Sequence, residues 1–403
     1  MIRNHLIPTF LFITFLFIFP RTTPLAAQDS TPQPSTVLAY MSDWDSCYAA
    51  PGDITVTVLD MPTNIRLDAY TAICLFPTWS DDGRFATATD NGIVVWSYDS
   101  TIAINPTETR ESGETWSPDG RLAFIAGTGS SSEIYIWDDG EITNVISQSA
   151  GRLAWSADGR LAFVSYVGDV GEIYVWDNGT VTNISQSSAQ DDNLSWSADG
   201  RLAFVSEQNG VDTVFVWDDG ILTSIGQWPD TGSFKWSADG RLAFVSYGET
   251  DDEIYIWDGT SAVSIGHSFI TPMGLVWSSD GYLAFITGEP DATEVYLWDG
   301  TALISLGQWQ SAWIAGWSSD GRLAFRGYSE DYGSTAIYVW ESGVLTDITE
   351  SVGGTSPAWS ADGRLAYMSN RDGSYDIYVW DGTGTTNVTN TPDIDEFDPR
   401  WLP

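Results

Sequence analysis

The chain has 403 residues, in which 55 acidic side chains outnumber 16 lysines and arginines, and its formal net charge is −39. Such a surface repels the phosphates of nucleic acids and of anionic lipid head groups, which excludes nucleic-acid binding as a function. It attracts cations such as Ca²⁺ and basic partners, although acidity can also serve only to keep an exported protein dissolved.

Residues 1–27 have the pattern of an export signal. A short basic start with Arg3 precedes an apolar run at 6–19, and Leu25-Ala26-Ala27 offers small residues for cleavage. The run is shorter than the roughly 20 residues that a bilayer span needs, so we expect cleavage near Ala27 rather than an uncleaved membrane anchor. The prediction is a secreted, periplasmic or cell-surface protein with no membrane span after cleavage and a net charge of −41. Residues 28–36 are expected to form a disordered leader.

The rest of the chain is built on a repeat of about 40 residues that contains the sequence Trp-Ser-x-Asp-Gly. Neighbouring copies are 37 to 42 residues apart, and a ninth tryptophan, Trp401, continues the spacing. A fixed period of this length is typical of solenoids and propellers. The eight complete copies begin at Trp79, Trp116, Trp155, Trp196, Trp236, Trp277, Trp317 and Trp359.

Each copy contains four short segments with the composition of β-strands. Strand A holds Trp-Ser, strand B is Leu-Ala-Phe-Val-Ser or a variant, strand C is Ile-Tyr-Val-Trp, and strand D is a short apolar segment after a glycine turn, as at 142–146. Asp-Gly or Asn-Gly turns bound them, which is a hairpin signal. Strands B and C are apolar on both faces, as in a sheet packed between two others. We therefore expect the repeated tryptophans to lie in the core.

The two ends of the repeat array are predicted to meet in one sheet. Residues 37–78 contain matches to strands B and C but no strand A, and the segment around Trp401 is a strand A without a copy of its own. Joining them removes two exposed sheet edges, which invite aggregation. The sequence thus predicts an all-β, single β-propeller domain at 37–403 with nine four-stranded blades, or eight as the alternative, closed by the C-terminal strand.

The repeat resembles the WD40-like repeat of TolB-type β-propellers. The resemblance lies in Trp116-Ser117-Pro118-Asp119-Gly120-Arg121-Leu122-Ala123-Phe124, in Ile377-Tyr378-Val379-Trp380-Asp381 and in Ser369-Asn370-Arg371-Asp372-Gly373. It covers about 37–403 and implies the propeller fold. Members of this family include periplasmic scaffolding proteins, propellers attached to serine peptidases, and propeller lyases, so the resemblance does not select a function.

The residues that catalysis would need are scarce. The sequence has no Gly-x-Ser-x-Gly elbow, and His267 is the one histidine after residue 27. A serine-histidine triad or a histidine-based metal site is therefore not expected, and we predict that the chain is not an enzyme. The aspartates of the Asp-Gly turns are explained by the turns themselves, and the arginine that follows is expected to bridge to acidic groups of its own or the next blade. Paired carboxylates remain an open alternative.

Two further features are left open by the sequence. Cys47 and Cys74 form an even pair in an exported chain, which suggests a disulfide, with two free thiols as the alternative. No cofactor is predicted, but acidic clusters at 191–192, 249–253 and 393–396 keep Ca²⁺ binding possible without matching an EF-hand loop.

The two sets of loops differ in a way that indicates a binding face. The A–B and C–D turns are nearly identical between copies, whereas the B–C and D–A loops differ in length and chemistry, and differing loops on a rigid scaffold usually serve recognition. Several side chains outside the repeat positions are assigned to these loops and are the candidate binding residues: Trp228, Tyr247, His267, Phe269, Trp309, Trp313, Tyr328 and Tyr332.

The sequence therefore predicts a monomeric, non-enzymatic propeller that holds a protein partner on the face with the B–C and D–A loops. A carbohydrate- or cell-wall-binding propeller is the alternative, because amphipathic rings beside acids suit sugar stacking as well as protein contact. A carboxylate-based hydrolase or lyase is a further alternative. Neither the ligand nor the biological process follows from the sequence.

Overall fold

The computed structural model describes most of the repeat region. The described residues are 37–42, 53–60, 65–73, 78–89, 92–96, 101–104, 111–127, 132–168, 170–249, 251–266, 273–289, 291–329 and 333–401. The chain divides into two units, 1–33 and 34–403, and every described residue belongs to the second. The predicted signal peptide and leader at 1–36, together with Cys47, Cys74, His267, Phe269 and Tyr332, lie outside the described residues.

The described residues form only β-structure, as predicted, in nine antiparallel sheets of four strands. No helix in these ranges is long and apolar enough to cross a membrane. Eight of the sheets follow the chain order from strand A to strand D. They are β4 (Thr78–Trp79), β5 (Phe85–Thr89), β6 (Gly92–Trp96) and β7 (Thr101–Ile104); β8 (Glu111–Trp116), β9 (Leu122–Ala126), β10 (Glu133–Asp138) and β11 (Glu141–Ile146); β12 (Ala150–Trp155), β13 (Leu161–Val167), β14 (Val170–Asp177) and β15 (Thr180–Asn183); β16 (Gln190–Trp196), β17 (Leu202–Gln208), β18 (Val211–Asp218) and β19 (Ile221–Trp228); β20 (Thr231–Trp236), β21 (Leu242–Ser246), β22 (Glu253–Trp257) and β23 (Ala262–Ser264); β24 (Met273–Trp277), β25 (Leu283–Glu289), β26 (Ala292–Trp298) and β27 (Leu303–Trp309); β28 (Ser311–Trp317), β29 (Leu323–Ser329), β30 (Ser334–Glu341) and β31 (Val344–Asp347); and β32 (Thr355–Trp359), β33 (Leu365–Ser369), β34 (Asp376–Trp380) and β35 (Thr385–Asn387).

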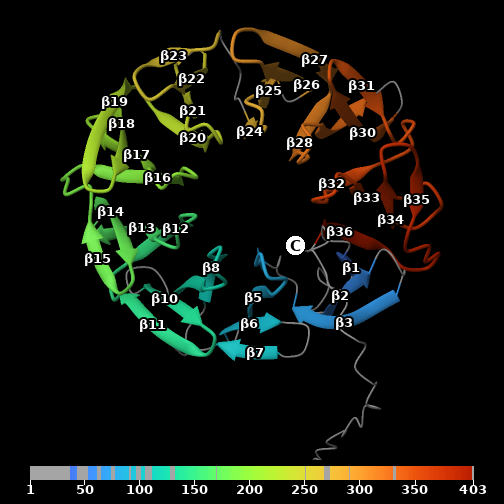
Figure 1. Ribbon diagram of the computed structural model, residues 1–403, viewed down its shortest axis with the longest axis horizontal. Coiled ribbons are helices and arrows are strands. Elements are labelled where there is room, and N and C mark those ends of the chain that lie inside the picture. The colour runs from blue at the N-terminus through green and yellow to red at the C-terminus, as the bar shows by residue number, and fades with distance from the viewer. Residues whose placement is uncertain are drawn as a thin grey trace, which may run out of the picture. The chain divides into compact units, whose positions relative to one another are not determined.

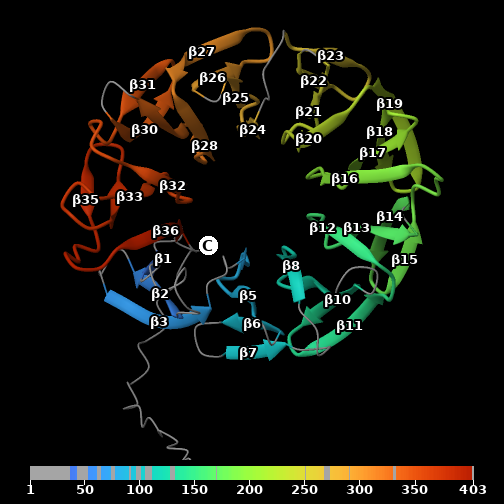
Figure 2. The same cartoon turned by 180° about the vertical axis from the view of Figure 1, so that it is seen from behind.

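The ninth sheet joins the two ends of the repeat region. It contains β1 (Val37–Ser42), β2 (Asp53–Asp60), β3 (Ile65–Ile73) and the last strand, β36 (Glu396–Trp401). Strand β36 pairs antiparallel with β1, with Leu38 opposite Trp401 and Ser42 opposite Glu396. Figures 1 and 2 show the sheets side by side around a centre, with the A strands innermost and the D strands on the rim.

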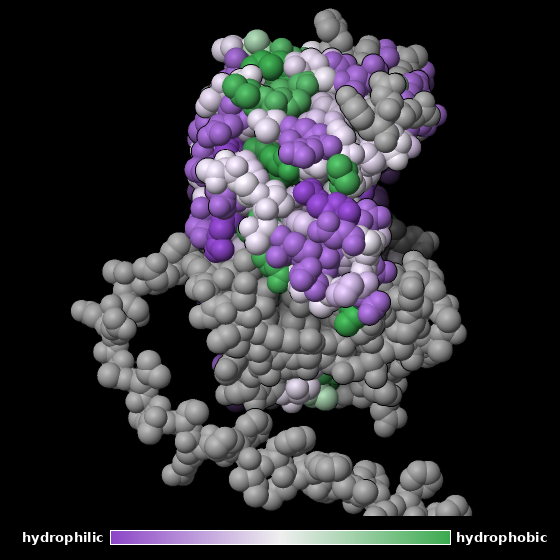
Figure 3. All heavy atoms as spheres, turned by 90° about the vertical axis from the view of Figure 1, so that its right-hand side faces the viewer, coloured by the Kyte–Doolittle hydropathy of each residue, from purple (hydrophilic) through white to green (hydrophobic). Residues whose placement is uncertain are grey.

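The burial of each strand follows its place in the sheet. The B strands are the most buried, and the phenylalanines at their centres, such as Phe163 and Phe244, are fully enclosed. The D strands face outward, and Ile221 and Val344 are more than half exposed. On the side of the ring drawn in Figure 3, hydrophobic atoms lie in small groups among hydrophilic ones rather than in one patch. Scattered exposure of this kind is normal for a folded surface.

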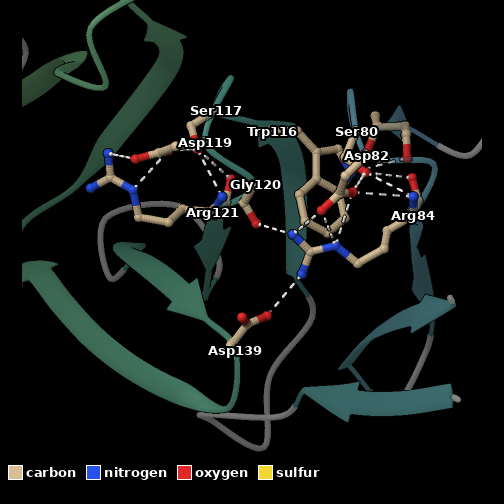
Figure 4. A network of polar contacts seen from close by, with 10 residues as sticks. Ser80, Asp82, Arg84, Trp116, Ser117, Asp119, Gly120, Arg121 and Asp139 are labelled. Carbon is tan, nitrogen blue, oxygen red and sulfur yellow. Dashed lines mark hydrogen bonds and ion pairs between the residues drawn. The ribbon is translucent and has the colours of Figure 1, made fainter. Parts of the chain in front are cut away.

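An arginine in each A–B turn links one sheet to the next. Arg160 donates to Asp158 in its own turn at 3.1 Å and to the backbone carbonyl of Gly200 in the next turn at 3.0 Å. Its guanidinium also lies over the rings of Trp196 and Trp217 in the next sheet, 4.9 and 5.5 Å from their centroids. Figure 4 shows the same arrangement around Arg84 and Trp116. We call this set of contacts the arginine clamp, and it confirms the bridging role predicted for the repeated arginine.

The clamp recurs around the ring with one substitution. Arg84, Arg121, Arg160, Arg201, Arg241 and Arg322 all donate to the glycine of the following turn. In the A–B turn between β24 and β25, Tyr282 replaces the arginine. Its ring lies 6.1 Å from that of Trp317 and 5.6 Å from that of Trp340 in the next sheet. The A-strand tryptophans add a second link, because each indole N–H from Trp116 to Trp401 donates to a carbonyl of the preceding A strand at 2.9 to 3.1 Å.

Loss of one clamp should destabilise the ring locally. Arg160→Met removes side-chain hydrogen bonds to Asp158, Asp219 and Gly200 together with two cation–π contacts, and leaves the carbonyl of Gly200 without its donor. We expect the free energy of unfolding to fall by about 1–3 kcal/mol, measured by urea unfolding. The matched control is Arg152→Met, because Arg152 forms one exposed ion pair with Asp192 and should cost less than about 1 kcal/mol. Equal losses in the two variants would contradict the role of the clamp.

The clamp aspartates also predict a loss of stability in acid. Burial raises the pKa of the Asp158 carboxyl, but the hydrogen bonds from Ser156 and Arg160 lower it by more. The pKa therefore lies below its ordinary value of 3.8. A carboxyl whose pKa is lower in the folded protein than in the unfolded chain stabilises the fold at pH values above the unfolded pKa. This stabilisation is lost as the pH falls through the folded pKa. Asp158→Asn should therefore lower the melting temperature at pH 6, and its difference from the wild type should shrink toward pH 2. Asp280→Asn, in the turn that carries Tyr282, is the matched control and should show the smaller effect at pH 6.

A pair of buried carboxyl groups, one of them at the start of β36, also makes the stability of the fold depend on pH. Glu396 and Asp376 are both buried, and both accept hydrogen bonds from the hydroxyl groups of Thr389 and Thr391. Each hydroxyl has one hydrogen and cannot serve two carboxylates, so a proton on one of the acids relieves the conflict. The pKa of Glu396 is raised to about 7: burial raises it most, the hydrogen bonds from Thr391 and Thr389 lower it, and the charge of Asp376 adds a smaller increase.

This carboxyl pair predicts a loss of stability toward neutral pH. Because the folded pKa of Glu396 lies above its unfolded value, its contribution is complete below about 4.5 and is lost as pH rises through about 7. Glu396→Gln keeps the shape of the side chain without the charge, so its melting temperature should fall less between pH 5 and pH 8 than that of the wild type. Parallel curves for the two proteins would contradict the assignment.

Candidate functional site

The inner A strands carry a β-bulge at a recurring position. In seven of them the residue three positions before the repeat tryptophan has a positive φ, and the pairing register shifts there, as between Gly151 and Leu153 in β12. A β-bulge bends its strand and re-aims the side chain at that point. The seven residues are Gly113, Arg152, Asn193, Ser233, Gly274, Ser356 and Asp398, with φ between 47° and 66°.

Strand β28 departs from this pattern. Its bulge lies later, between Ile314 and Gly316, and Gly316 has a φ of 135°. The pairing with β29 therefore runs without interruption from Ser311 to Ile314 and sets Trp313 directly opposite Arg326. Directly opposed residues share one face of the sheet. The displaced bulge thus brings an indole and a guanidinium together on the same surface.

Trp313 and Arg326 line a cavity of about 230 Å³ among the inner strands. The lining residues come from three A strands, β28, β32 and β36, and from the B strand β29, and Figure 1 shows β28, β32 and β36 among the inner strands. Two prolines, Pro357 and Pro399, give it stiff walls. We call it the inner pocket, and its lining residues are Trp313, Arg326, Thr355, Ser356, Pro357, Asp398, Pro399 and Arg400.

Arg326 is an exception within the B strands. The equivalent positions hold buried aliphatic side chains: Val164, Val205, Val245, Ile286 and Met368. The guanidinium of Arg326 is half-buried and donates from Nη1 to the hydroxyl of Thr355 at 3.1 Å. None of the ion pairs among the described residues involves Arg326. A cation in this place costs desolvation that no described acid offsets, which indicates a role other than packing.

Two side chains of the inner pocket, Arg400 and Trp313, are exposed. Arg400 forms an ion pair with Asp398 at 3.0 Å, and its side chain is 54% exposed. Trp313 is 49% exposed, which leaves much of its ring free to meet a ligand. An exposed indole beside a guanidinium without an acidic partner offers both an apolar face and a forked hydrogen-bond donor.

The structure separates the three tryptophans that the sequence grouped together. Trp228 and Trp309 end the D strands β19 and β27, and Trp313 lies in β28, so their assignment to D–A loops was wrong. The sequence Ile/Leu-Gly-Gln-Trp continues the D strand in both cases, with Trp228 paired to Asp212 and Trp309 to Thr293.

Trp228 and Trp309 pack onto the next sheet. The Trp228 ring lies 4.7 Å from that of Phe244, and the Trp309 ring lies 4.8 Å from that of Phe325. Trp309 is 8% exposed and occupies the space above Gly327, where a Cβ would come within 2.4 Å of the indole. These contacts explain the two rings by packing between sheets, and a binding role for them is untested.

The remaining described candidates lie apart from the inner pocket. Tyr247 follows β21, and its hydroxyl is 3.2 Å from that of Ser233. Tyr328 lies in β29, opposite Ser311. The structure therefore does not bring the predicted aromatics into one surface, and of these only Trp313 lines the cavity. Arg326 was missed, although its signal is in the sequence: Leu-Ala-Phe-Arg has an arginine where the other complete copies have alanine, valine, isoleucine or methionine.

The acidic clusters do not gather into a metal site in the described residues, where no group of three or more His, Cys, Asp or Glu side chains could hold an ion. In the cluster at 191–192, Asp191 is fully buried and Asp192 forms an ion pair with Arg152. In the cluster at 393–396, Glu396 is satisfied by threonine hydroxyls. Calcium binding remains a prediction without a site.

Comparison with known proteins gives the fold. No protein-family model and no curated protein sequence matches the chain. Among solved structures, dipeptidyl peptidase 4 of Porphyromonas gingivalis is 15% identical over 77% of this chain and 58% of its own, with a TM-score of 0.55. TolB from Acinetobacter baumannii is 16% identical over 64% and 76%, with a TM-score of 0.37. The β-propeller domain of the Trilobed protease from Pyrococcus furiosus is 17% identical over 70% and 98%, with a TM-score of 0.41.

Identities this low show the fold alone and say nothing of activity. The similar structures include peptidases as well as TolB, so they do not select between an enzyme and a binding protein. The β-propeller fold predicted from the repeat is confirmed.

Proposed function

We propose that the chain is an exported, non-catalytic propeller of nine blades that holds a protein partner at the inner pocket. The pairing of β36 with β1 supports a closed ring, because it places the last A strand in the sheet that begins the repeat region. The pattern at residues 1–27 supports export. A closed ring of clamped sheets is a rigid support for a recognition site.

The observation that carries the binding role is the departure of one inner strand from the repeat. The displaced bulge in β28 exposes Trp313, and the arginine at position 326 replaces an aliphatic core residue beside it. Neither change improves the packing of the sheet, and both face the same cavity. Features that depart from an internal repeat without a structural gain are expected at functional sites.

Two observations support a protein rather than an enzymatic or a glycan function. The sequence after residue 27 has a single histidine and no Gly-x-Ser-x-Gly elbow, so the nucleophile and base of a peptidase are missing from its motifs. The strongly acidic chain favours basic protein surfaces and disfavours acidic polysaccharides. Neutral carbohydrate binding is the second candidate, and the exposed ring of Trp313 favours it.

Binding to an immobilised peptide library and to a glycan array separates these candidates. We expect the full chain to bind a subset of peptides, and Trp313→Ala to weaken that binding at least tenfold, since an exposed aromatic anchor is lost. Val344→Ala, on the rim, is the control and should bind as the wild type does. Trp313-dependent binding to glycans alone would establish the carbohydrate alternative, and turnover of any substrate that is lost on a single Asp or Glu change would overturn the non-catalytic assignment.

A further inference from the structure

The inner pocket contains a positive charge that the rest of the protein does not use. The chain has 55 acidic side chains, and each clamp arginine of the complete turns has an aspartate partner two residues before it. Arg326 donates a hydrogen bond to the neutral hydroxyl of Thr355 and forms no ion pair with a described acid. In a chain this rich in carboxylates, a half-buried guanidinium that forms no ion pair with a described acid is suited to a carboxylate supplied from outside.

The distribution of the other basic residues points the same way. Outside the clamps, three further basic residues, Arg152, Lys235 and Arg400, lie on inner strands within three residues of the repeat tryptophans of β12, β20 and β36. Others lie elsewhere: Arg66 is in the D strand β3, and Arg371 lies between β33 and β34. Arg152 and Arg400 are partly neutralised by Asp192 and Asp398, so the charge available to a ligand is centred on Arg326.

The size and charge of the pocket limit what can enter. A cavity of about 230 Å³ holds one small group rather than a folded surface. The long-range field of the acidic chain repels polyanions, whereas a single carboxylate on a neutral or basic carrier meets only the local field of the pocket. Asp398 beside Arg400 further disfavours a second negative charge. A peptide with one carboxylate and an adjoining apolar group matches both the guanidinium and the exposed ring of Trp313.

We propose that the inner pocket binds one carboxylate of a protein partner, from its chain end or from an acidic side chain, through Arg326, Thr355 and the face of Trp313. This inference rests on the proposed function and names the chemistry that the site recognises. The guanidinium of Arg326 pairs with the carboxylate through two parallel hydrogen bonds while the adjoining apolar group packs on Trp313.

Three short peptides and one sugar test the inference against the full chain. The peptides are acetyl-Lys-Lys-Leu with a free carboxylate, the same peptide as its amide, and acetyl-Lys-Glu-Leu as its amide, and the sugar is glucuronate. We expect the free carboxylate or the glutamate peptide to bind about 10- to 100-fold more tightly than acetyl-Lys-Lys-Leu-amide, as measured by fluorescence titration or NMR. The two carboxylate peptides distinguish the chain end from the side chain.

Variants at Arg326 provide the decisive comparison. Arg326→Met is well suited because Met368 occupies the equivalent position of β33 in this same protein. It should abolish the preference for the carboxylate, Arg326→Lys should restore part of it, and Arg152→Met should leave it unchanged. Circular dichroism and melting curves confirm that each variant is folded.

The outcomes separate this inference from the proposed function. Equal binding of acid and amide that is lost in Trp313→Ala would overturn the carboxylate inference and leave the binding role. Arg326-dependent binding of glucuronate without any peptide would overturn the assignment to a protein partner. Lack of Arg326-dependent binding by every probe would overturn the inference, and the peptide library with Trp313→Ala would then decide the proposed function independently.

Discussion

The arginine clamp between successive sheets is the interaction on which this structure depends. A sheet with two apolar faces cannot exist alone in water, and each sheet here must be held against two neighbours. The clamp does this at the rim of the core by joining a charge pair in one sheet to a carbonyl and two indole rings in the next, as around Arg160. The indole N–H groups of the A strands add a second row of links nearer the centre. These two rows fix the inner strands that form the pocket.

Because the clamps carry the packing, the inner strands are free to vary. The bulges of β12, β16 and β20 all place different side chains at one structural position, while the tryptophan three residues later keeps its contact with the preceding sheet. Strand β28 differs most from the others. Its bulge lies later in the strand, yet the indole N–H of Trp317 still donates to the carbonyl of Val276. The pocket is thus a local change in a scaffold that does not depend on it.

The sequence predicted what the repeat itself determines. Strand type, strand order and the bridging arginine all follow from residues that recur in register, such as the Asp158-Gly159-Arg160 turn, because the same local physics applies at each copy. Trp228 and Trp309 were misplaced because strand ends depend on pairing with a neighbour, and the Gly-Gln-Trp segment extends a D strand that looks shorter in the sequence. The pocket was only partly predictable: Trp313 was found as an unexplained aromatic, whereas its partner Arg326 comes from another strand and is brought opposite it by a bulge that no local motif signals.

The direction of the clamp has a consequence for how such a protein is built. Each of the six clamp arginines reaches from its own sheet to the following one, so these repeats have a donor side and an acceptor side of constant chemistry. Head-to-tail contacts of this kind join any number of identical units, and rotation per unit alone decides when they close. Duplication of a repeat would therefore create compatible joints at once, and the number of blades is limited by angular fit rather than by matching surfaces.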